Sequence, residues 1–249
     1  MTRKHILCTW LALLLILLAL LVVVREPRFP AMPDLTAIED VGARKQAFYD
    51  YLLPIVRYHN ARIRQDRERL LDIAGEGAEP GWSARRWLRG LSEEYEVEYD
   101  DRRLEEVLVT LQRRVDVIPA DLALAQAAVE SGWGRSRFAL EANNLFGQRC
   151  YEPGCGLAPK GRESARFEVL KLPSISEAIR RYMNNLNTHE RYRGFRVIRE
   201  QQREQGMAIQ GEPLVSGLVS YSERGDEYLN QLLGMLRRNR SLLERVDEA

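Results

Sequence analysis

Residues 120–134 read ADLALAQAAVESGWG, and this stretch decides the fold that we expect. Alanine and leucine cover most of the circumference of a helix from Ala120 to about Glu130, and a helix that is apolar all round is a buried one. Pro119 and Asp121 suit its first turn, where the missing N–H of proline costs nothing and an acidic group complements the helix dipole. Two glycines end the helix. We therefore predict a buried central helix.

Glu130 lies where this helix ends. A helix C-terminus carries about half a negative charge, which disfavours an ionised carboxylate, and Val129 and Trp133 would add desolvation. Both effects raise the pKa of a carboxyl group, and a protonated carboxyl near neutral pH is what general-acid cleavage of a glycosidic bond requires. Gly132 and Gly134 lack side chains, which leaves room for a substrate. The alternative is a glycine-capped helix end with Glu130 exposed and Trp133 in the core.

Helical spacing of apolar residues continues on both sides of this stretch. It begins at Val41, and Pro54 should kink or restart that helix, after which a charged helix runs to about Ile73. Further helices are expected over 83–91, 100–115, 174–186 and 227–246.

A different pattern separates the central helix from the later ones. Residues 147–172 hold turn residues and a short alternating stretch with Phe167 and Val169, which predicts a small β-hairpin lobe. The expected fold class is therefore mainly α. A helical body that faces a hairpin lobe across a groove suits an extended polymer.

The first 25 residues differ from the rest. Arg3, Lys4 and His5 precede a run, 6–24, without a charged residue, and a helix of that length rises about 28 Å, close to the hydrocarbon thickness of a bilayer. No small-residue cleavage site follows. We expect an uncleaved signal anchor, with a cleaved signal as the alternative; in both cases the remaining chain faces the outside of the inner membrane.

Cysteine usage and charge narrow the chemistry further. Cys150 and Cys155 bracket a Pro-Gly turn that brings them together, which in an exported domain predicts a disulfide. A zinc site is the competing interpretation, but zinc normally takes four ligands and the three histidines are scattered. The formal net charge of +1 gives no drive toward nucleic acid.

A resemblance to a known family adds to these inferences. The run Ala125–Gly134, followed by Asn143–Gly147, resembles the signature of the glucosaminidase domains of glycoside hydrolase family 73. It covers about Val117 to the C-terminus, and the stretch Arg44–Pro54 with the cysteine loop resembles the Bax-like branch found in Gram-negative bacteria. The resemblance implies a lysozyme-like α fold and cleavage of the β-1,4 bond that follows N-acetylglucosamine in peptidoglycan.

The resemblance also assigns catalytic roles. The essential acid of the matching motif is Glu130, and in the later motif Tyr221–Tyr228 the residue Tyr221 best matches the tyrosine that faces this acid. The second carboxylate has no clean match. Its candidates are Glu152, Glu163 and Glu168. We choose Glu163, just before the proposed strand; the alternatives are that it is an exposed loop residue and that the substrate's own N-acetyl group acts as nucleophile.

Three further residues are expected to bind substrate beside the acid: Trp133, Asn144 and Phe146. Trp133 has a flat apolar face of the kind that stacks on sugar rings. The alternatives are a helix cap for Asn144 and core positions for Phe146 and Tyr221.

The sequence therefore predicts a membrane-anchored endo-β-N-acetylglucosaminidase of peptidoglycan. Its expected parts are a signal anchor (1–25), a stalk and helical prefix (26–116) and the catalytic domain (117–249). We expect a single pass through the inner membrane with the catalytic domain in the periplasm. The expected partners are peptidoglycan strands and the membrane, with no cofactor, metal or nucleic acid. The alternatives are a lytic transglycosylase and a non-catalytic peptidoglycan-binding or scaffold protein.

Overall fold

A computed structural model describes residues 27–75, 79–159 and 166–244 of the chain. The chain divides into two units, Met1–Pro30 and Ala31–Ala249, and every described helix and strand lies in the second. The predicted signal anchor lies outside the described residues. Among the helices that are described, none is long and apolar enough to cross a bilayer.

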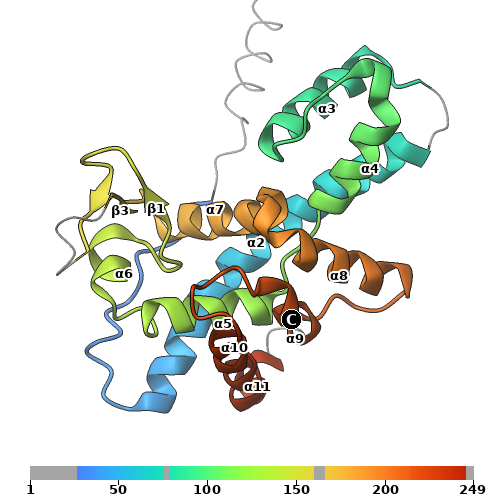
Figure 1. The fold of residues 1–249 in the computed structure, drawn as a ribbon. Helices are drawn as coiled ribbons and strands as arrows, with labels where there is room; N and C mark the ends of the chain where they lie inside the picture. The colour runs from blue at the N-terminus through green and yellow to red at the C-terminus, as the bar shows by residue number, and fades with distance from the viewer. Residues whose placement is uncertain (1–26, 76–78, 160–165, 245–249) are drawn as a thin grey trace, which may run out of the picture. The chain divides into compact units, whose positions relative to one another are not determined.

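The described part is mainly helical with one small sheet, as predicted (Figure 1). Its elements are α2 (Val41–Gly75), α3 (Trp82–Glu94), η1 (Asp101–Arg103), α4 (Leu104–Arg114), α5 (Ala120–Ser131), α6 (Arg137–Ala142), β1 (Arg149–Cys150), β2 (Gly156–Leu157), β3 (Glu168–Leu170), α7 (Ile175–Thr188), η2 (Glu190–Tyr192), α8 (Arg193–Glu204), α9 (Gly211–Leu214), η3 (Val215–Leu218), α10 (Asp226–Arg238) and α11 (Arg240–Glu244).

Helix α5 is the buried central helix that the sequence predicted. Every residue from Leu122 to Ala128 is buried, because α2 packs on one side of α5 and α10 on another (Figure 1). The small alanine side chains let these neighbours approach closely on several sides. The helix ends at Gly132, which takes the left-handed conformation of a C-terminal cap.

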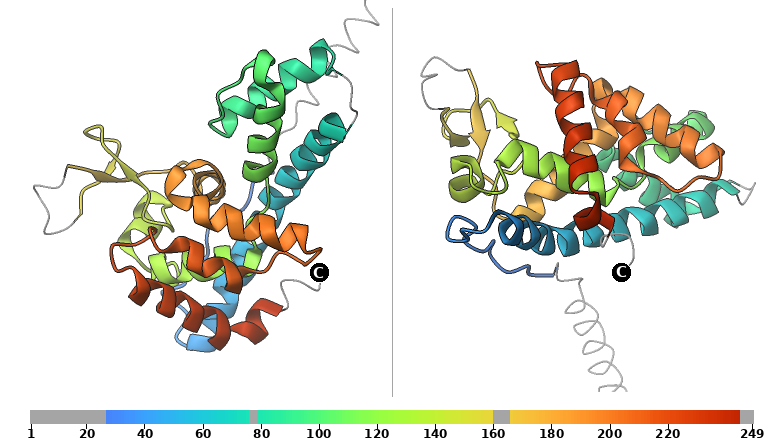
Figure 2. Two further views of the ribbon diagram at one scale, coloured as in Figure 1. Left: turned by 45° about the vertical axis from the view of Figure 1, so that its right-hand side comes forward. Right: turned by 90° about the horizontal axis from the view of Figure 1, so that it is seen from below.

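Helix α2 runs through Pro54 as one helix of 35 residues, so of the two expected outcomes, a kink or a restart, the restart does not occur (Figure 2). Proline removes one backbone hydrogen bond, from its own nitrogen to the carbonyl of Asp50. Buried side chains on both sides of the proline, Leu52, Ile55 and Val56, hold the helix in place. Their packing offsets the cost of the lost bond.

The lobe is a three-stranded antiparallel sheet in the order β1-β3-β2, so the predicted hairpin is too simple. Strand β3 is central: Val169 faces Arg149 of β1 on one side and Leu157 of β2 on the other. The disulfide joins Cys150, the last residue of β1, to Cys155, the residue before β2, and so keeps the chain that leaves β1 close to the start of β2.

A buried ionic cluster anchors the segment that leads into α5. Asp116 is 3% exposed, and its Oδ1 lies 2.7 Å from a guanidinium nitrogen of Arg203. Arg67 of α2 and Arg199 of α8 lie 3.7 and 3.8 Å from its Oδ2. The three arginines hold the pKa of the Asp116 carboxyl below its ordinary value, although burial opposes them. The cluster thus ties α2 and α8 to the start of the central helix.

Candidate active site

The end of α5 is built from three successive residues in the left-handed region: Gly132, Trp133 and Gly134 have φ values of 59°, 61° and 74°. The Ser131 hydroxyl supports this turn, since it donates to the carbonyl of Ala127 at 2.6 Å and accepts from the Gly134 N–H at 2.8 Å. The backbone therefore leaves the helix abruptly just after Glu130.

The two glycines of this turn have different surroundings. A Cβ on Gly132 would meet no atom within 4 Å, so the space that the sequence suggested for a substrate exists there. A Cβ on Gly134 would come within 2.9 Å of Leu35 Cδ1 and 3.3 Å of Phe48 Cδ2. The missing side chain of Gly134 is therefore used for packing against the N-terminal part of the unit.

Glu130 is half-buried at the end of α5. Burial raises the pKa of its carboxyl group, whereas a hydrogen bond from Tyr228 and the positive charge of Arg224 lower it; burial dominates. The raised pKa agrees with the sequence-based expectation for an acid at this position.

Tyrosines surround this carboxyl group. The negative charge of Glu130 contributes to raising the pKa of four of them: Tyr182 of α7, Tyr192 of η2, Tyr221 of the segment before α10 and Tyr228 of α10. Burial is the largest cause in each case. An anionic phenolate is therefore disfavoured at all four, and their hydroxyl groups stay protonated and able to donate.

Tyr221 lies in this group, and the catalytic role that the late motif implied for it stays a prediction. Its ring stacks on Tyr228 with centroids 5.4 Å apart and lies 5.9 Å from that of Tyr192. It is half-buried, and its hydroxyl donates to the carbonyl oxygen of Phe146 at 3.4 Å. Tyr221 is partly exposed, whereas Tyr228 is fully buried, and contact of Tyr221 with a substrate stays a prediction.

Sequence reasoning assigned no role to two residues that the structure places beside the acid. The Tyr228 hydroxyl accepts from Gln126 Nε2 at 2.9 Å, and Tyr228 and Glu130 lie close enough for each to shift the pKa of the other. Gln126 Oε1 in turn accepts from the Tyr182 hydroxyl at 2.6 Å. The i, i+4 spacing of Gln126 and Glu130, which places both on one face of α5, was the available signal.

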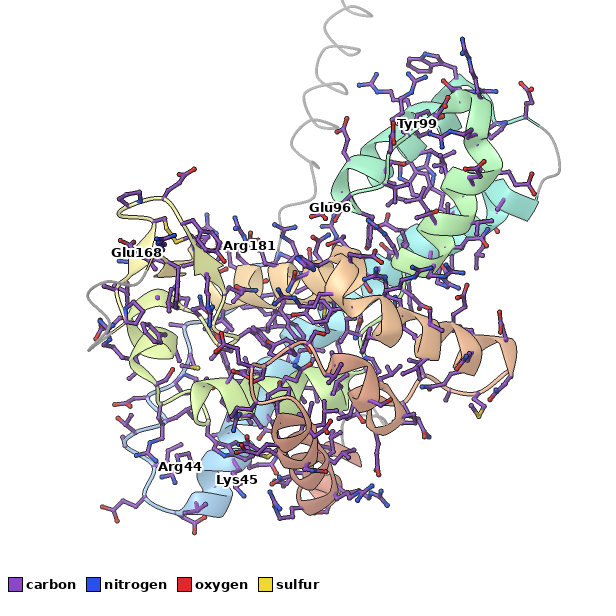
Figure 3. All side chains as sticks on the ribbon, in the orientation of Figure 1. Arg44, Lys45, Glu96, Tyr99, Glu168 and Arg181 are labelled. Carbon is purple, nitrogen blue, oxygen red and sulfur yellow. A yellow bond between two sulfur atoms is a disulfide. The ribbon has the colours of Figure 1, made fainter. Side chains whose placement is uncertain are left out.

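Trp133 packs against α2. Its ring lies 5.7 Å from that of Phe48 and 5.3 Å from that of Tyr49, and Lys45 Nζ lies 4.9 Å from its centroid. Lys45 lies near the start of α2 and Glu168 lies in the sheet, so the lysine beside Trp133 belongs to the helical body and not to the lobe (Figure 3). Trp133 therefore holds the end of α5 on α2, and sugar stacking by this half-buried ring stays a prediction.

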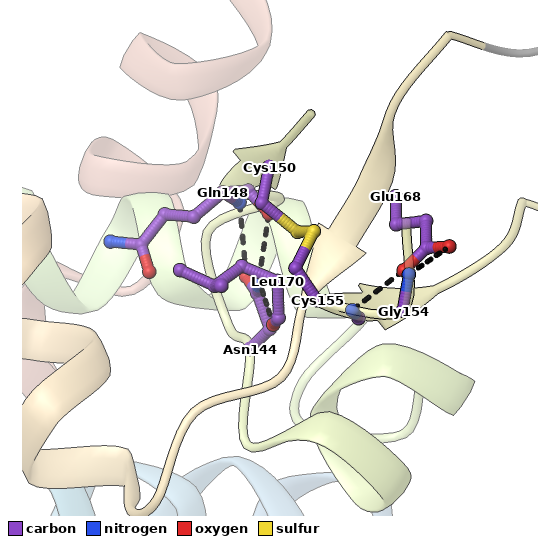
Figure 4. Close-up of a disulfide and its surroundings, with 8 residues drawn as sticks. Asn144, Gln148, Cys150, Gly154, Cys155, Glu168 and Leu170 are labelled. Carbon is purple, nitrogen blue, oxygen red and sulfur yellow. Dashed lines mark hydrogen bonds between the residues drawn. A yellow bond between two sulfur atoms is a disulfide. The ribbon is translucent and has the colours of Figure 1, made fainter. Parts of the chain in front are cut away.

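Asn144 ties the lobe to the helical body. Its amide nitrogen donates to the carbonyls of Gln148 and Leu170, both at 2.9 Å (Figure 4). Its amide oxygen accepts from the N–H groups of Phe146 and Gln148. These four bonds use both amide hydrogens and both oxygen lone pairs. Asn144 thus shapes the site through the backbone, and direct contact with substrate stays a prediction.

Phe146 is buried and stacks on Tyr182, with centroids 4.0 Å apart and planes within 7°. The Phe146 carbonyl accepts the hydrogen bond from Tyr221. It therefore connects two of the tyrosines that surround Glu130, one through its ring and the other through its backbone.

The predicted disulfide is present, with Cα atoms of Cys150 and Cys155 6.3 Å apart. Glu168 accepts from the N–H groups of Gly154 and Gly156 at 3.0 and 2.7 Å, which holds the loop and lowers the pKa of its carboxyl (Figure 4). The two sulfurs and this carboxylate lie within 4.8 Å of one another. Because the sulfurs are bonded to each other, they offer no thiolate to a metal ion.

The second carboxylate stays a prediction. Glu163 lies outside the described residues, Glu152 is exposed on the cysteine loop, and Glu168 is committed to two backbone N–H groups. Within the described part of the chain, the groups that shift the pKa of Glu130 are Tyr228 and Arg224, and neither is a carboxylate.

Comparisons with known proteins identify the family of the chain. Residues 105–240 match the family named Glucosaminidase, described as mannosyl-glycoprotein endo-beta-N-acetylglucosaminidase. The chain is 33% identical over 216 residues to Protein bax of Escherichia coli (strain K12), a match that covers 86% of this chain and 76% of that protein. No solved structure matches the chain, so the likeness to lysozyme stays a prediction.

Proposed function

Because this chain belongs to the glucosaminidase family, in its Bax-like branch, we propose that it is an endo-β-N-acetylglucosaminidase that cuts the glycan strands of peptidoglycan. Membership of the family supports a glycoside hydrolase. The observation that carries the finer proposal is Glu130, a half-buried carboxyl group with a raised pKa at an open helix end inside the matched region.

Glu130 acts in its protonated form. Its carboxyl proton passes to the glycosidic oxygen while the bond between that oxygen and the anomeric carbon breaks, and the sugar gains oxocarbenium character. Water supplies the hydroxyl group of the new reducing end and returns a proton to Glu130. Burial favours this mechanism, because it keeps the carboxyl group protonated at a higher pH than an exposed glutamate.

The partner of the acid follows one of two routes. In the first, Glu163 of the lobe serves as the base or stabiliser. In the second, the N-acetyl group of the substrate attacks the anomeric carbon, and Tyr221 orients that group. The tyrosines around Glu130 support the second route, since they supply neutral hydrogen-bond donors beside the acid.

We also propose that residues 1–25 anchor the protein in the inner membrane and that the catalytic domain is periplasmic. Two features support this location: the uncharged run 6–24 and the disulfide between Cys150 and Cys155, a bond typical of oxidising compartments. Protease treatment of intact spheroplasts tests it. Digestion of the catalytic domain supports the proposal, and full protection contradicts it.

Zymography on cell-wall sacculi tests the activity. We expect clearing by the wild type and by Glu141→Gln, a control on the exposed surface of α6, and no clearing by Glu130→Gln. Equal clearing by Glu130→Gln would remove Glu130 from the mechanism. No clearing by any variant would favour a peptidoglycan-binding module, or the glycoprotein substrate that the family description names.

Mass spectrometry of the products separates the two enzyme classes. Reducing-end N-acetylglucosamine is the expected product. Anhydromuramic ends would instead identify a lytic transglycosylase.

A further inference from the structure

A hollow of about 420 Å³ lies between α2 and α3, apart from the site at the end of α5. Asp66 of α2 lines it together with six residues of α3: Ser83, Arg86, Trp87, Gly90, Leu91 and Glu94. Its volume lies within the range of about 300–1,000 Å³ that is usual for small-molecule sites. All seven residues precede the region that matches the glucosaminidase family, residues 105–240.

The lining residues of α3 form one face of the helix, because they recur at intervals of three or four positions. Ser83, Gly90 and Glu94 on this face are exposed, and Trp87 is half-buried. Leu91 is 4% exposed and gives the hollow an apolar base. The hollow is therefore open to solvent and combines polar with apolar surface.

The indole ring of Trp87 is held in place beside the hollow. The guanidinium carbon of Arg69 lies 4.4 Å from the ring centroid, a cation–π contact. Arg69 does not line the hollow, so the part of the ring that does is one that Arg69 leaves uncovered. A fixed aromatic surface is thus available to a ligand.

Gly90 keeps the hollow open next to this ring. It lies inside α3, where glycine costs helix stability relative to alanine. Among the described residues, a Cβ on Gly90 would meet no atom within 4 Å, and its φ is not positive. Neither packing nor backbone geometry therefore requires glycine here, whereas a ligand that lies along the helix would need the space.

The charges around the hollow nearly balance. Asp66 and Glu94 are acidic, Arg86 is basic, and Arg69 adds a second positive charge at the ring. Burial and the negative charge of Glu94 raise the pKa of Asp66, while Arg62 and Arg69 lower it. A neutral ligand with hydroxyl and amide groups suits this lining, because the carboxylates accept hydrogen bonds and the guanidinium donates them.

We propose that the hollow between α2 and α3 is a second glycan-binding site, which holds an N-acetylated sugar of a peptidoglycan strand against Trp87. The apolar side of the sugar ring lies on the indole, its hydroxyl groups donate to Asp66 and Glu94, and its N-acetyl carbonyl accepts from Arg86. The proposal goes beyond the proposed function, although the choice of an N-acetylated sugar rests on it.

The position of α3 gives such a site a use. Helix α3 lies on the opposite side of the helical unit from the sheet (Figure 1). A strand bound at α3 is held away from Glu130, so the protein stays on the polymer after the other site releases a product. Two contacts with one polymer raise the overall affinity without any change at the catalytic site.

The test is fluorine NMR of the full chain, with 5-fluorotryptophan in place of its four tryptophans. Glu130→Gln keeps the ligand uncut, and single replacements by phenylalanine assign the signals. The probe is the β-1,4-linked trimer of N-acetylglucosamine. We expect a saturable shift of the Trp87 signal. The signal of Trp82, which lies on the same helix but does not line the hollow, should not move.

Two substitutions in the same background test the lining. Gly90→Leu fills the hollow with a residue of higher helix propensity, so α3 is kept and the shift of Trp87 should disappear. Asp66→Ala should weaken binding about tenfold, as for one hydrogen bond to a charged group. If Gly90→Leu does not fold, Asp66→Ala decides.

The matched control is Gly81→Leu. Gly81 is exposed at the start of α3, lies outside the lining, and its Cβ would also meet nothing within 4 Å among the described residues. It should bind the trimer with unchanged affinity. The proposal is overturned if the Trp87 signal does not move with the trimer, if both lining variants bind normally, or if the control loses as much affinity as they do.

The titration also separates this inference from the proposed function. A wild type that leaves sacculi intact, together with a moving Trp87 signal, would sink the proposed function and keep the second site. Clearing by the wild type with a stationary Trp87 signal would do the reverse. A stem peptide without sugar that moves the signal when the trimer does not would identify a peptide site and overturn the proposal.

Discussion

Replacing Asp116 by asparagine should destabilise the whole helical unit. The substitution keeps the shape of the side chain but removes the one negative charge among three arginines at 2.7–3.8 Å. Arg199 is 1% exposed and cannot turn to water. Breaking a buried pair in this way costs about 3–5 kcal/mol of unfolding free energy.

Two features of the cluster indicate that the loss of unfolding free energy is near the lower end of this range. Arg199 also donates to the carbonyls of Asp116, Val117 and Arg113, which partly replace the lost carboxylate. The Arg203 side chain is 39% exposed and can reach solvent. We therefore expect a loss of about 3 kcal/mol, which lowers Tm by about 6–12 °C in a chain of this size.

Thermal unfolding followed by circular dichroism checks this value. The control is Glu106→Gln, whose carboxylate lies 3.6 Å from Arg103 with side chains 71% and 51% exposed, and which should cost less than about 1 kcal/mol. The folded-state pKa of Asp116 is lowered, so its contribution is present above the unfolded pKa of about 3.9 and is lost as pH falls through the folded value. The Tm difference should thus persist at neutral pH and close in acid. Equal melting of Asp116→Asn and the control at neutral pH would refute the reasoning.

Three further outcomes are expected. Because Glu130 must be protonated and its pKa is raised, hydrolysis of sacculi should fall as pH rises through that pKa. In Glu130→Gln, kcat should collapse and the alkaline limb of the kcat/KM profile should change. An unchanged alkaline limb in this variant would contradict the role of Glu130. Gly134→Ala should lower Tm more than Gly132→Ala. Both glycines have positive φ, but only a Cβ on Gly134 would lie 2.9 Å from the buried Leu35. Equal melting temperatures would show that this contact relaxes. Replacing Cys150 and Cys155 together by serine should cost about 2 kcal/mol, because the loop they close is short, and hydrogen exchange of the lobe should show where protection is lost.

The sequence predicted the helical body well because its signals are local. Alanine and leucine around the whole of α5 identified a buried helix, and the glycines after Glu130 marked its end. The spacing of Cys150 and Cys155 with a turn between them predicted a bond that the structure contains. Each of these features depends on residues within a few positions of one another.

Local signals were incomplete at two positions for the same reason. Pro54 breaks a helix when its neighbours are solvated, but in α2 buried side chains on both sides keep the helix continuous. The alternation at Phe167 and Val169 identified a strand without showing that it pairs on both edges. In both cases contacts with distant residues outweighed the local preference.

What the sequence determined by itself is that an acidic residue, Glu130, stands at the end of a buried helix, a position that favours a raised pKa. What only the tertiary structure decided is which polar groups meet one another in the core beside this helix. Gln126, Tyr182 and Tyr228 lie on three helices, and their hydroxyl and amide groups meet because α7 and α10 pack around α5. Periodicity shows which face of each helix is buried, but a hydrogen bond between helices depends on their relative position to within less than an ångström, and that position is a property of the whole packed core.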